Sequence, residues 1–356
     1  MQVIDVDVHP VFKSPAEMRE YLPSRWHHLT RHTTRIPVRI DTINNGMRVD
    51  SRPDEGPAGS DPNLLKRQLL DEAGVDIAVL VHHASGNLPN PAADASWCAA
   101  INEWQAATWI GDYNDHGRFR SSIRVPAHEP EAALREIERW GDHPHFVQIL
   151  VVHSYQPAFG HPMYERIWRA AADRGLPVAI HATNDKIGAT AGTLGPFGYP
   201  SFTFEWHTAT YPSAYASHLA SLVCSGIFER IPNLKFVMVE GGVSWTLALG
   251  NHLDRNWRLL HSEVPELKDK PSEYLRRHVF FGTQPIEEPF NGPAPLLDVW
   301  NELDVARRLM FASDYPHWDF DHPKRALPRI ARELKQRILV ENARDLYGLP
   351  ADRPAE

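Results

Sequence analysis

Eight short apolar runs alternate with helix-like segments along this chain, and that alternation limits the possible folds more than any other feature. The runs are rich in β-branched residues, which favour strands. They cover residues 3–9, 76–83, 119–126, 146–153, 177–182, 234–242, 278–284 and 308–317. Strands that alternate with helices form parallel sheets, and eight such units favour a closed (β/α)8 TIM barrel, an α/β fold, over an open sheet.

The segments between these runs carry apolar residues at helical spacing. Helices are predicted at 62–75, 93–113, 129–142, 161–175 and 213–232, with the last ones at 324–335 and 339–349. The stretch 10–62 is rich in Gly, Pro and Asp and is expected to be an irregular insertion after strand 1. The stretch 183–215 is expected to be a long loop or lid after strand 5. We find no repeat or linker, and we predict one domain over 1–356.

Composition excludes several classes of protein. The net charge is -8 with no basic stripe, so a nucleic-acid partner is not expected. No apolar run of about 18 residues offers a membrane span, and the N-terminus does not resemble a signal peptide. Two cysteines, Cys98 and Cys224, cannot build a disulfide framework and indicate a reducing compartment, so we expect a cytoplasmic protein. No glycine-rich phosphate motif opens any predicted helix.

The first strand ends in the sequence DVDVHP, which places three polar residues on one face. Residues two apart in a strand point to the same side, so Asp5, Asp7 and His9 lie opposite Val6 and Val8. A carboxylate and an imidazole at a strand end can bind a cation. They can equally form a polar strand terminus, and the rest of the chain must decide.

Three other predicted strands also end in a residue that can bind a metal or carry a proton. His181 follows Val-Ala-Ile, Glu240 follows Phe-Val-Met-Val, and Asp314 follows Leu-Met-Phe-Ala-Ser. Each has a structural alternative: a hydrogen-bonded histidine, a charge at a helix N-terminus, or a turn cap. In a TIM barrel, however, all strand ends of this kind meet at one mouth. A buried carboxylate cluster is unfavourable unless a cation or protons neutralise it, which favours a metal site.

The opening DVDVHP, GLPVAIH at strand 5, NLKFVMVEGG at strand 6, SDYPHWD at strand 8 and the closing ENARDLYGL resemble the amidohydrolase superfamily. The resemblance covers nearly the whole chain. It points to the branch that contains aminocarboxymuconate-semialdehyde decarboxylase and γ-resorcylate decarboxylase. Carried over position by position, it implies one divalent metal ion held by Asp7, His9, His181 and Asp314.

Two motifs depart from the usual pattern of this superfamily. Strand 1 carries Asp-x-His in place of the common His-x-His, and strand 6 carries Glu240-Gly-Gly in place of His-Gly-Gly. Glutamate also accepts protons, so Glu240 is the candidate general base, with a metal contact as the alternative. Asp314 is expected to be catalytic as well as a ligand. Two imidazoles and two carboxylates suit Zn²⁺ or Mn²⁺, and zinc is the first expectation.

Substrate contacts are expected from His317 in SDYPHWD, from Arg124 at the end of strand 3, and from Trp206 and His207 in the irregular stretch. Arginine suits a carboxylate because it can donate two parallel hydrogen bonds. The structural alternatives are a packed turn for His317, an ion pair for Arg124, and burial for Trp206 and His207.

Three classes of function remain open, and the resemblance adds hydration of a double bond as a further reaction that Glu240 could serve. The first is a metal-dependent decarboxylase, a carbon–carbon lyase, acting on a small aromatic or unsaturated carboxylic acid. The second is a metal-dependent hydrolase of a lactone, ester or amide in which Glu240 activates a metal-bound water. The third is a barrel that only binds a ligand. The resemblance also implies a homodimer or higher homo-oligomer, for which the eleven tryptophans leave room on the surface.

Overall fold

The structure is a computed structural model that describes residues 2–32, 46–82, 88, 90–182, 208, 211–287 and 292–351. Its centre is an eight-stranded sheet in which every strand is hydrogen-bonded to the next in chain order. All seven ladders are parallel. The strands are β1 Ile4–Val8, β2 Ile77–Leu80, β3 Phe119–Arg124, β4 Phe146–Val152, β5 Val178–His181, β6 Phe236–Val239, β7 Val279–Gly282 and β8 Leu309–Met310.

Backbone bonds between β1 and the chain that follows β8 close the sheet into a barrel. The Val6 N–H donates to the Phe311 carbonyl at 3.0 Å. The His9 N–H donates to the Tyr315 carbonyl at 2.8 Å, and Val8 forms a parallel bridge with Tyr315. The predicted (β/α)8 TIM barrel is therefore confirmed.

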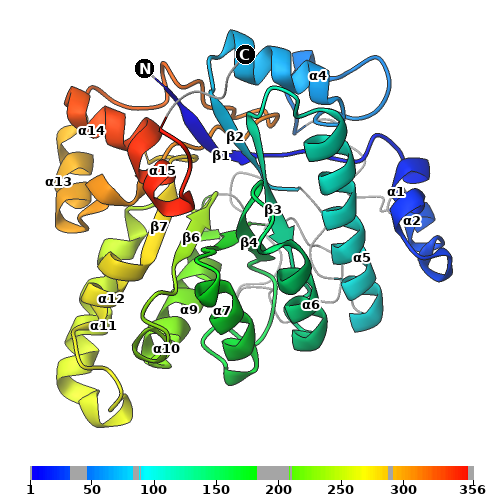
Figure 1. Cartoon of the computed structure of the whole chain (residues 1–356). Coiled ribbons are helices and arrows are strands. Elements are labelled where there is room, and N and C mark those ends of the chain that lie inside the picture. Colours follow the sequence, from blue (N-terminus) through cyan, green and yellow to red (C-terminus); the bar gives the residue numbers. More distant parts are fainter. Residues whose placement is uncertain are drawn as a thin grey trace.

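Helices surround the strands on the outside (Figure 1). None of those in the described segments has the length and apolar character needed to cross a membrane. The α-helices are α1 Pro15–Tyr21, α2 Leu29–His32, α4 Pro62–Leu65, α5 Pro91–Trp104, α6 Pro130–Trp140, α7 Glu165–Asp173, α9 Tyr211–Cys224, α10 Ile227–Arg230, α11 Trp245–Leu260, α12 Pro271–His278, α13 Ala294–Glu302, α14 Arg332–Gln336 and α15 Asn342–Tyr347. Wider π-helical turns extend α4 over Lys66–Glu72 and α5 over Gln105–Asp112, and another joins α14 to α15 over Arg337–Glu341.

Two local predictions were wrong. The insertion after β1 is not wholly irregular, because it contains α1 and α2. The Ser14 hydroxyl caps α1 by accepting the Glu17 N–H at 3.2 Å, an interaction typical of a Ser-x-x-Glu start. The helix predicted at 324–335 begins only at Arg332. Pro328 explains the difference, since proline lacks an N–H and disfavours helix in the residue before it.

The tryptophans belong mainly to the interior. Trp104, Trp109 and Trp168 are fully buried between the strands and helices. Trp318 is the large exception in the described segments, with 64% of its surface exposed. The expectation that many tryptophans lie at the surface was therefore wrong, and they support the core instead.

Asn102 of α5 connects two helices to the barrel. Its side-chain oxygen accepts the Arg124 N–H at 2.8 Å, and its amide donates to the Arg124 carbonyl at 2.8 Å and to Glu136 Oε2 of α6 at 2.7 Å. The backbone groups of Arg124 are buried at the end of β3. They have no partner in β2, because β2 ends at Leu80. The Asn102 side chain thus takes the place of a neighbouring strand.

We predict that Asn102→Ala lowers the free energy of unfolding by about 2–4 kcal/mol, because buried backbone groups lose their partners. Urea denaturation of the purified protein measures this difference. Asn251→Ala, at an exposed position of α11, is the matched control and should change stability by less than about 0.5 kcal/mol. Equal effects of the two substitutions would contradict the role given to Asn102.

Candidate metal centre at the carboxyl ends of the strands

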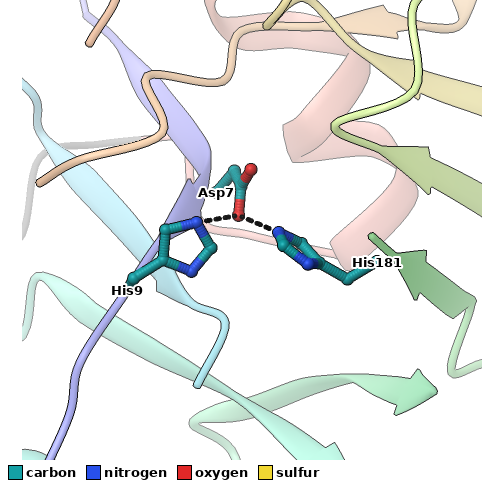
Figure 2. A group of neighbouring side chains, drawn as sticks. All are labelled: Asp7, His9 and His181. Carbon is teal, nitrogen blue, oxygen red and sulfur yellow. Dashed lines mark ion pairs between the residues drawn. The ribbon is translucent and has the colours of Figure 1, made fainter. Parts of the chain in front are cut away.

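Asp7 in β1 and His9, directly after its last residue, lie at the mouth of the barrel, as the period of the strand predicts. Both side chains are fully buried. The His9 Nδ1–H donates to the Val81 carbonyl at 2.8 Å, which fixes the ring and leaves the lone pair on Nε2. Figure 2 shows that this nitrogen faces Asp7, at 3.3 Å from Oδ1.

His181 ends β5 and approaches Asp7 from another strand of the barrel (Figure 2). Its Nδ1–H donates to the Ala182 carbonyl at 2.5 Å, so its Nε2 also points to the centre. That nitrogen lies 3.6 Å from Asp7 Oδ1 and 3.4 Å from Glu240 Oε2. The side chains of β1, β5 and β6 therefore meet at one point.

Asp314 completes the group from the chain after β8. Its Oδ1 lies 2.7 Å from His9 Nε2 and 2.5 Å from His317 Nδ1. Two sets of three possible ligands result, Asp7 with His9 and His181, and His9 with Asp314 and His317. Because His9 Nδ1 is already bonded to a carbonyl, only its Nε2 can bind an ion, so the two sets meet at this nitrogen.

The donor atoms of Asp7, His9 and His181 fit one small divalent ion, whereas Asp314 Oδ1 lies at hydrogen-bond distance, 2.7 Å, from His9 Nε2. Ligand atoms about 2.0–2.2 Å from a common ion lie roughly 3.0–3.6 Å from one another. The distances from Asp7 Oδ1 to the two imidazole nitrogens, 3.3 and 3.6 Å, fall in this range. Both carboxylate oxygens of Asp7 are buried and accept no hydrogen bond from any residue in the described segments. A cation would satisfy them.

The backbone is unusual at two of these positions. Glu240 and Asp314 both adopt φ 58°, in the left-handed region that non-glycine residues seldom occupy. Such conformations are unfavourable and concentrate at functional sites. Both residues directly follow apolar stretches that lead out of the barrel, so the chain turns sharply where their side chains meet the mouth.

The turn after Glu240 is held from two sides. The Tyr215 ring packs against Gly241, and the Tyr215 hydroxyl donates to the Val239 carbonyl at 2.5 Å. Glu287, which follows β7, accepts the N–H groups of Val243 at 2.8 Å and Ser244 at 2.6 Å. The position of Glu240 is thus determined by packing and hydrogen bonds.

Burial and mutual charge shift the pKa values of the cluster. Burial raises the pKa of Glu240 to about 8, although the charge of His181 opposes the shift. Burial would lower the pKa of His181, but the Asp7 and Glu240 carboxylates outweigh it and raise that pKa to about 9. Burial, followed by the charges of Glu240 and Asp7, raises the pKa of Asp314 well above its usual range. The site thus holds more carboxyl groups than it can ionise without a cation.

The residues expected to contact substrate have different surroundings. His317 lies against Asp314, so it supports a carboxylate of the centre. Arg124 is 1% exposed and forms no ion pair with an acid in the described segments. Its Nε and Nη2 have no hydrogen-bond partner there either. The charge of the buried Asp94 still acts on Arg124 from beyond ion-pair distance, so the structural alternative keeps an acid as its neighbour. Trp206 and His207 lie outside the described residues.

Two acids near the centre were missed from the sequence. Asp319 accepts a hydrogen bond from Gln284 Nε2 at 2.8 Å, and its charge contributes to raising the pKa values of Glu240 and Asp314. Its place five residues after Asp314 in SDYPHWDF was the available signal. Glu287, which holds the turn after Glu240, gave no signal, because its contact is 43–44 residues away along the chain.

A family model described as "Amidohydrolase" matches residues 4–349. The chain belongs to the amidohydrolase family. This agrees with the resemblance drawn from the five motifs and with the position of the site at the barrel mouth.

Similar proteins include decarboxylases. The chain is 25% identical over 226 residues to a γ-resorcylate decarboxylase of Rhodococcus jostii, and the match covers 58% of this chain and 62% of the relative. It is 25% identical over 300 residues to a γ-resorcylate decarboxylase of Polaromonas, covering 79% and 86%. The chain thus spans less than two thirds of the Rhodococcus relative.

The fold is shared with a solved dihydroxybenzoic acid decarboxylase of Polaromonas that contains bound manganese and an inhibitor. The TM-score is 0.68 at 17% sequence identity, over 98% of this chain and 97% of that one. At this identity the likeness concerns the fold.

We predict that Gly241→Ala destabilises the protein by about 1–3 kcal/mol through overpacking. The added Cβ would lie 2.6 Å from two Tyr215 ring carbons, so the turn after Glu240 must move. Gly250→Ala in α11 is the control, because its nearest contacts are ordinary ones of 3.6 and 3.7 Å and alanine favours helix. Thermal unfolding of both variants tests this, and a stability equal to wild type in Gly241→Ala would show that the packing is loose.

Proposed function

We propose that this chain is a metal-dependent decarboxylase of a small aromatic carboxylic acid. The observation that carries the proposal is the meeting of Asp7, His9 and His181, with Asp314 against His9 and Glu240 beside His181. The curated relatives support the reaction class, since those compared are named γ-resorcylate decarboxylases. We also propose that residues 1–356 form one domain that acts on a small molecule as a homo-oligomer.

The proposed ligands are Asp7, His9, His181 and Asp314. A divalent ion held there supplies Lewis acidity, which favours binding of a carboxylate together with a neighbouring oxygen of the substrate. Zinc remains compatible with this donor set, while two carboxylates and the manganese bound to the Polaromonas decarboxylase support Mn²⁺. Metal analysis of the purified protein distinguishes the two ions.

The protein's own groups then perform the proton transfer. We assign Glu240 as the acid that delivers a proton to the ring carbon that bears the carboxylate. As the new C–H bond forms, the C–C bond to the carboxylate breaks, its electron pair returns to the ring, and CO2 leaves. The Asp314 carboxylate contacts His9 and so orients the His9 ring. The same carboxylate oxygen contacts His317, which holds it in place. We keep three residues as predicted substrate contacts: Arg124, Trp206 and His207. The buried N–H donors of Arg124 suit an acidic group of the substrate.

Hydrolysis remains the competing reaction, because a carboxylate such as Glu240 beside a metal centre can also activate water. The two reactions give different products from the same protein. Metal-loaded protein incubated with hydroxybenzoates and with a lactone panel separates them. Release of CO2 with formation of the phenol supports the proposal, and ring opening of a lactone without CO2 refutes it.

We predict that Glu240→Gln lowers kcat for decarboxylation by at least about 100-fold, because the amide cannot transfer the proton. Glu263→Gln, at an exposed position, is the matched control and should keep wild-type turnover. The measurement is CO2 release from a dihydroxybenzoate, with metal content determined for each variant. Turnover of Glu240→Gln within a few-fold of wild type would remove Glu240 from the mechanism.

We predict that Asp7→Asn weakens binding of the divalent ion by at least about 10–100-fold, because the centre loses a buried negative charge while its shape is kept. Competition with a chromophoric chelator measures the affinity. Asp61→Asn is the matched control, since Asp61 caps α4 and asparagine caps helices equally well. Equal affinities in the two variants would place the metal elsewhere.

A further inference from the structure

Asp5 is a buried acid in β1 that none of the roles above uses. It points to the same side of the strand as Asp7 and is 0% exposed. Its Oδ1 accepts two backbone hydrogen bonds, from the Asp7 N–H at 3.1 Å and from the Ser313 N–H at 3.0 Å. One oxygen thus joins β1 to the chain after β8.

This oxygen occupies a gap in the bonding that closes the barrel. β8 is regular only over Leu309–Met310, and the following residues run beside β1 with isolated bonds. The Val6 N–H reaches the Phe311 carbonyl at 3.0 Å, and the Asp314 N–H reaches the Asp7 carbonyl at 3.2 Å. Between these two bonds, the N–H groups of Asp7 and Ser313 both turn to the Asp5 side chain. Asp7 and Ser313 are fully buried, so water does not offer another acceptor.

Asp7 and Ser313, which donate their N–H groups to Asp5, lie at or next to proposed ligands. Asp7 is itself a ligand, and Ser313 directly precedes Asp314. The Ser313 hydroxyl also accepts the Tyr315 N–H at 3.2 Å, which fixes the backbone on the other side of Asp314. A change at Asp5 therefore acts on both carboxylates of the metal centre at once.

We propose that Asp5 is a positioning residue of the metal centre, which fixes the backbone at Asp7 and beside Asp314 so that both carboxylates can reach one divalent ion. This inference rests on the metal site of the proposed function. Asp5 does so as an acceptor: its second oxygen has no hydrogen-bond partner in the described segments. An amide oxygen in the same place can accept the same two bonds, whereas an aliphatic side chain cannot.

Another buried polar residue in the barrel provides a matched control. Gln148 of β4 is 0% exposed, donates to Ser122 Oγ at 2.9 Å and accepts from the Tyr347 hydroxyl at 2.8 Å. Like Asp5 it makes two buried hydrogen bonds, but neither reaches the backbone of a proposed ligand. Its loss should lower stability without moving the metal centre.

The experiment compares Asp5→Leu, Asp5→Asn and Gln148→Leu in the full chain. Chelator competition measures the affinity for Mn²⁺ and Zn²⁺, and thermal unfolding of the metal-free protein measures stability. We expect Asp5→Leu to weaken metal binding about 10–100-fold, as changes behind metal ligands typically do. Asp5→Asn should stay within about threefold of wild type. Gln148→Leu should be less stable with unchanged affinity.

If Asp5→Leu does not fold, Asp5→Ala replaces it in the comparison, because alanine also removes the acceptor and adds no volume. Wild-type affinity in the aliphatic Asp5 variants, or an equal loss of affinity in Asp5→Asn, overturns the role of Asp5. An equal loss in Gln148→Leu overturns it too, since the effect would then reflect stability alone. If wild type takes up neither ion, the proposed function fails, and this outcome is distinct from the failure of Asp5.

Discussion

Closure of the barrel between β1 and the chain after β8 is the constraint on which the site depends. It brings His9 within 2.7 Å of Asp314, although the two residues are 305 positions apart. Few backbone bonds achieve this, because β8 is regular over only two residues. The same bonds that close the sheet fix the ligands: the His9 N–H holds the Tyr315 carbonyl, and the Asp314 N–H holds the Asp7 carbonyl. The contacts that close the barrel therefore also bring the candidate ligands together.

The backbone at the strand ends shows how the fold accommodates this chemistry. A left-handed conformation is unfavourable by roughly 1–2 kcal/mol for a residue other than glycine. Glu240 and Asp314 both adopt it, and contacts on either side hold them there. Tyr215 and Glu287 hold the turn after Glu240, and Asp5 holds the residue before Asp314. The strain is local, and the contacts that offset it come from distant parts of the chain.

The difference between local features and contacts from distant parts of the chain explains what could be predicted from the sequence. The two-residue period of a strand is a local property, and the alternation of strands with helices is visible along the chain. The barrel and the shared face of Asp7 and His9 could therefore be predicted from the sequence. Glu240 and Asp314 could be selected because polar residues after apolar runs stand at strand ends. The contacts of Asp319 and Glu287 could not be predicted, because they arise only once β6, β7 and β8 are assembled. The same holds for His317, whose contact with a ligand depends on the turn that follows Asp314.

Charge balance connects the metal to the proposed reaction. Asp7, Glu240, Asp314 and Asp319 influence one another electrostatically, and burial opposes ionisation of Glu240 and Asp314. An aromatic carboxylate entering this mouth would add one more negative charge to the same place. Asp7, His9, His181 and Asp314 are the residues that would hold a divalent ion, whose charge would allow these carboxylates to ionise and would still attract an anionic substrate. Glu240 lies beside His181, and in the proposed reaction it retains a proton for the ring carbon. The acidic character of the mouth, unfavourable for an anionic substrate in the protein alone, is thus the reason why the proposed reaction calls for a cation in substrate binding as well as in catalysis.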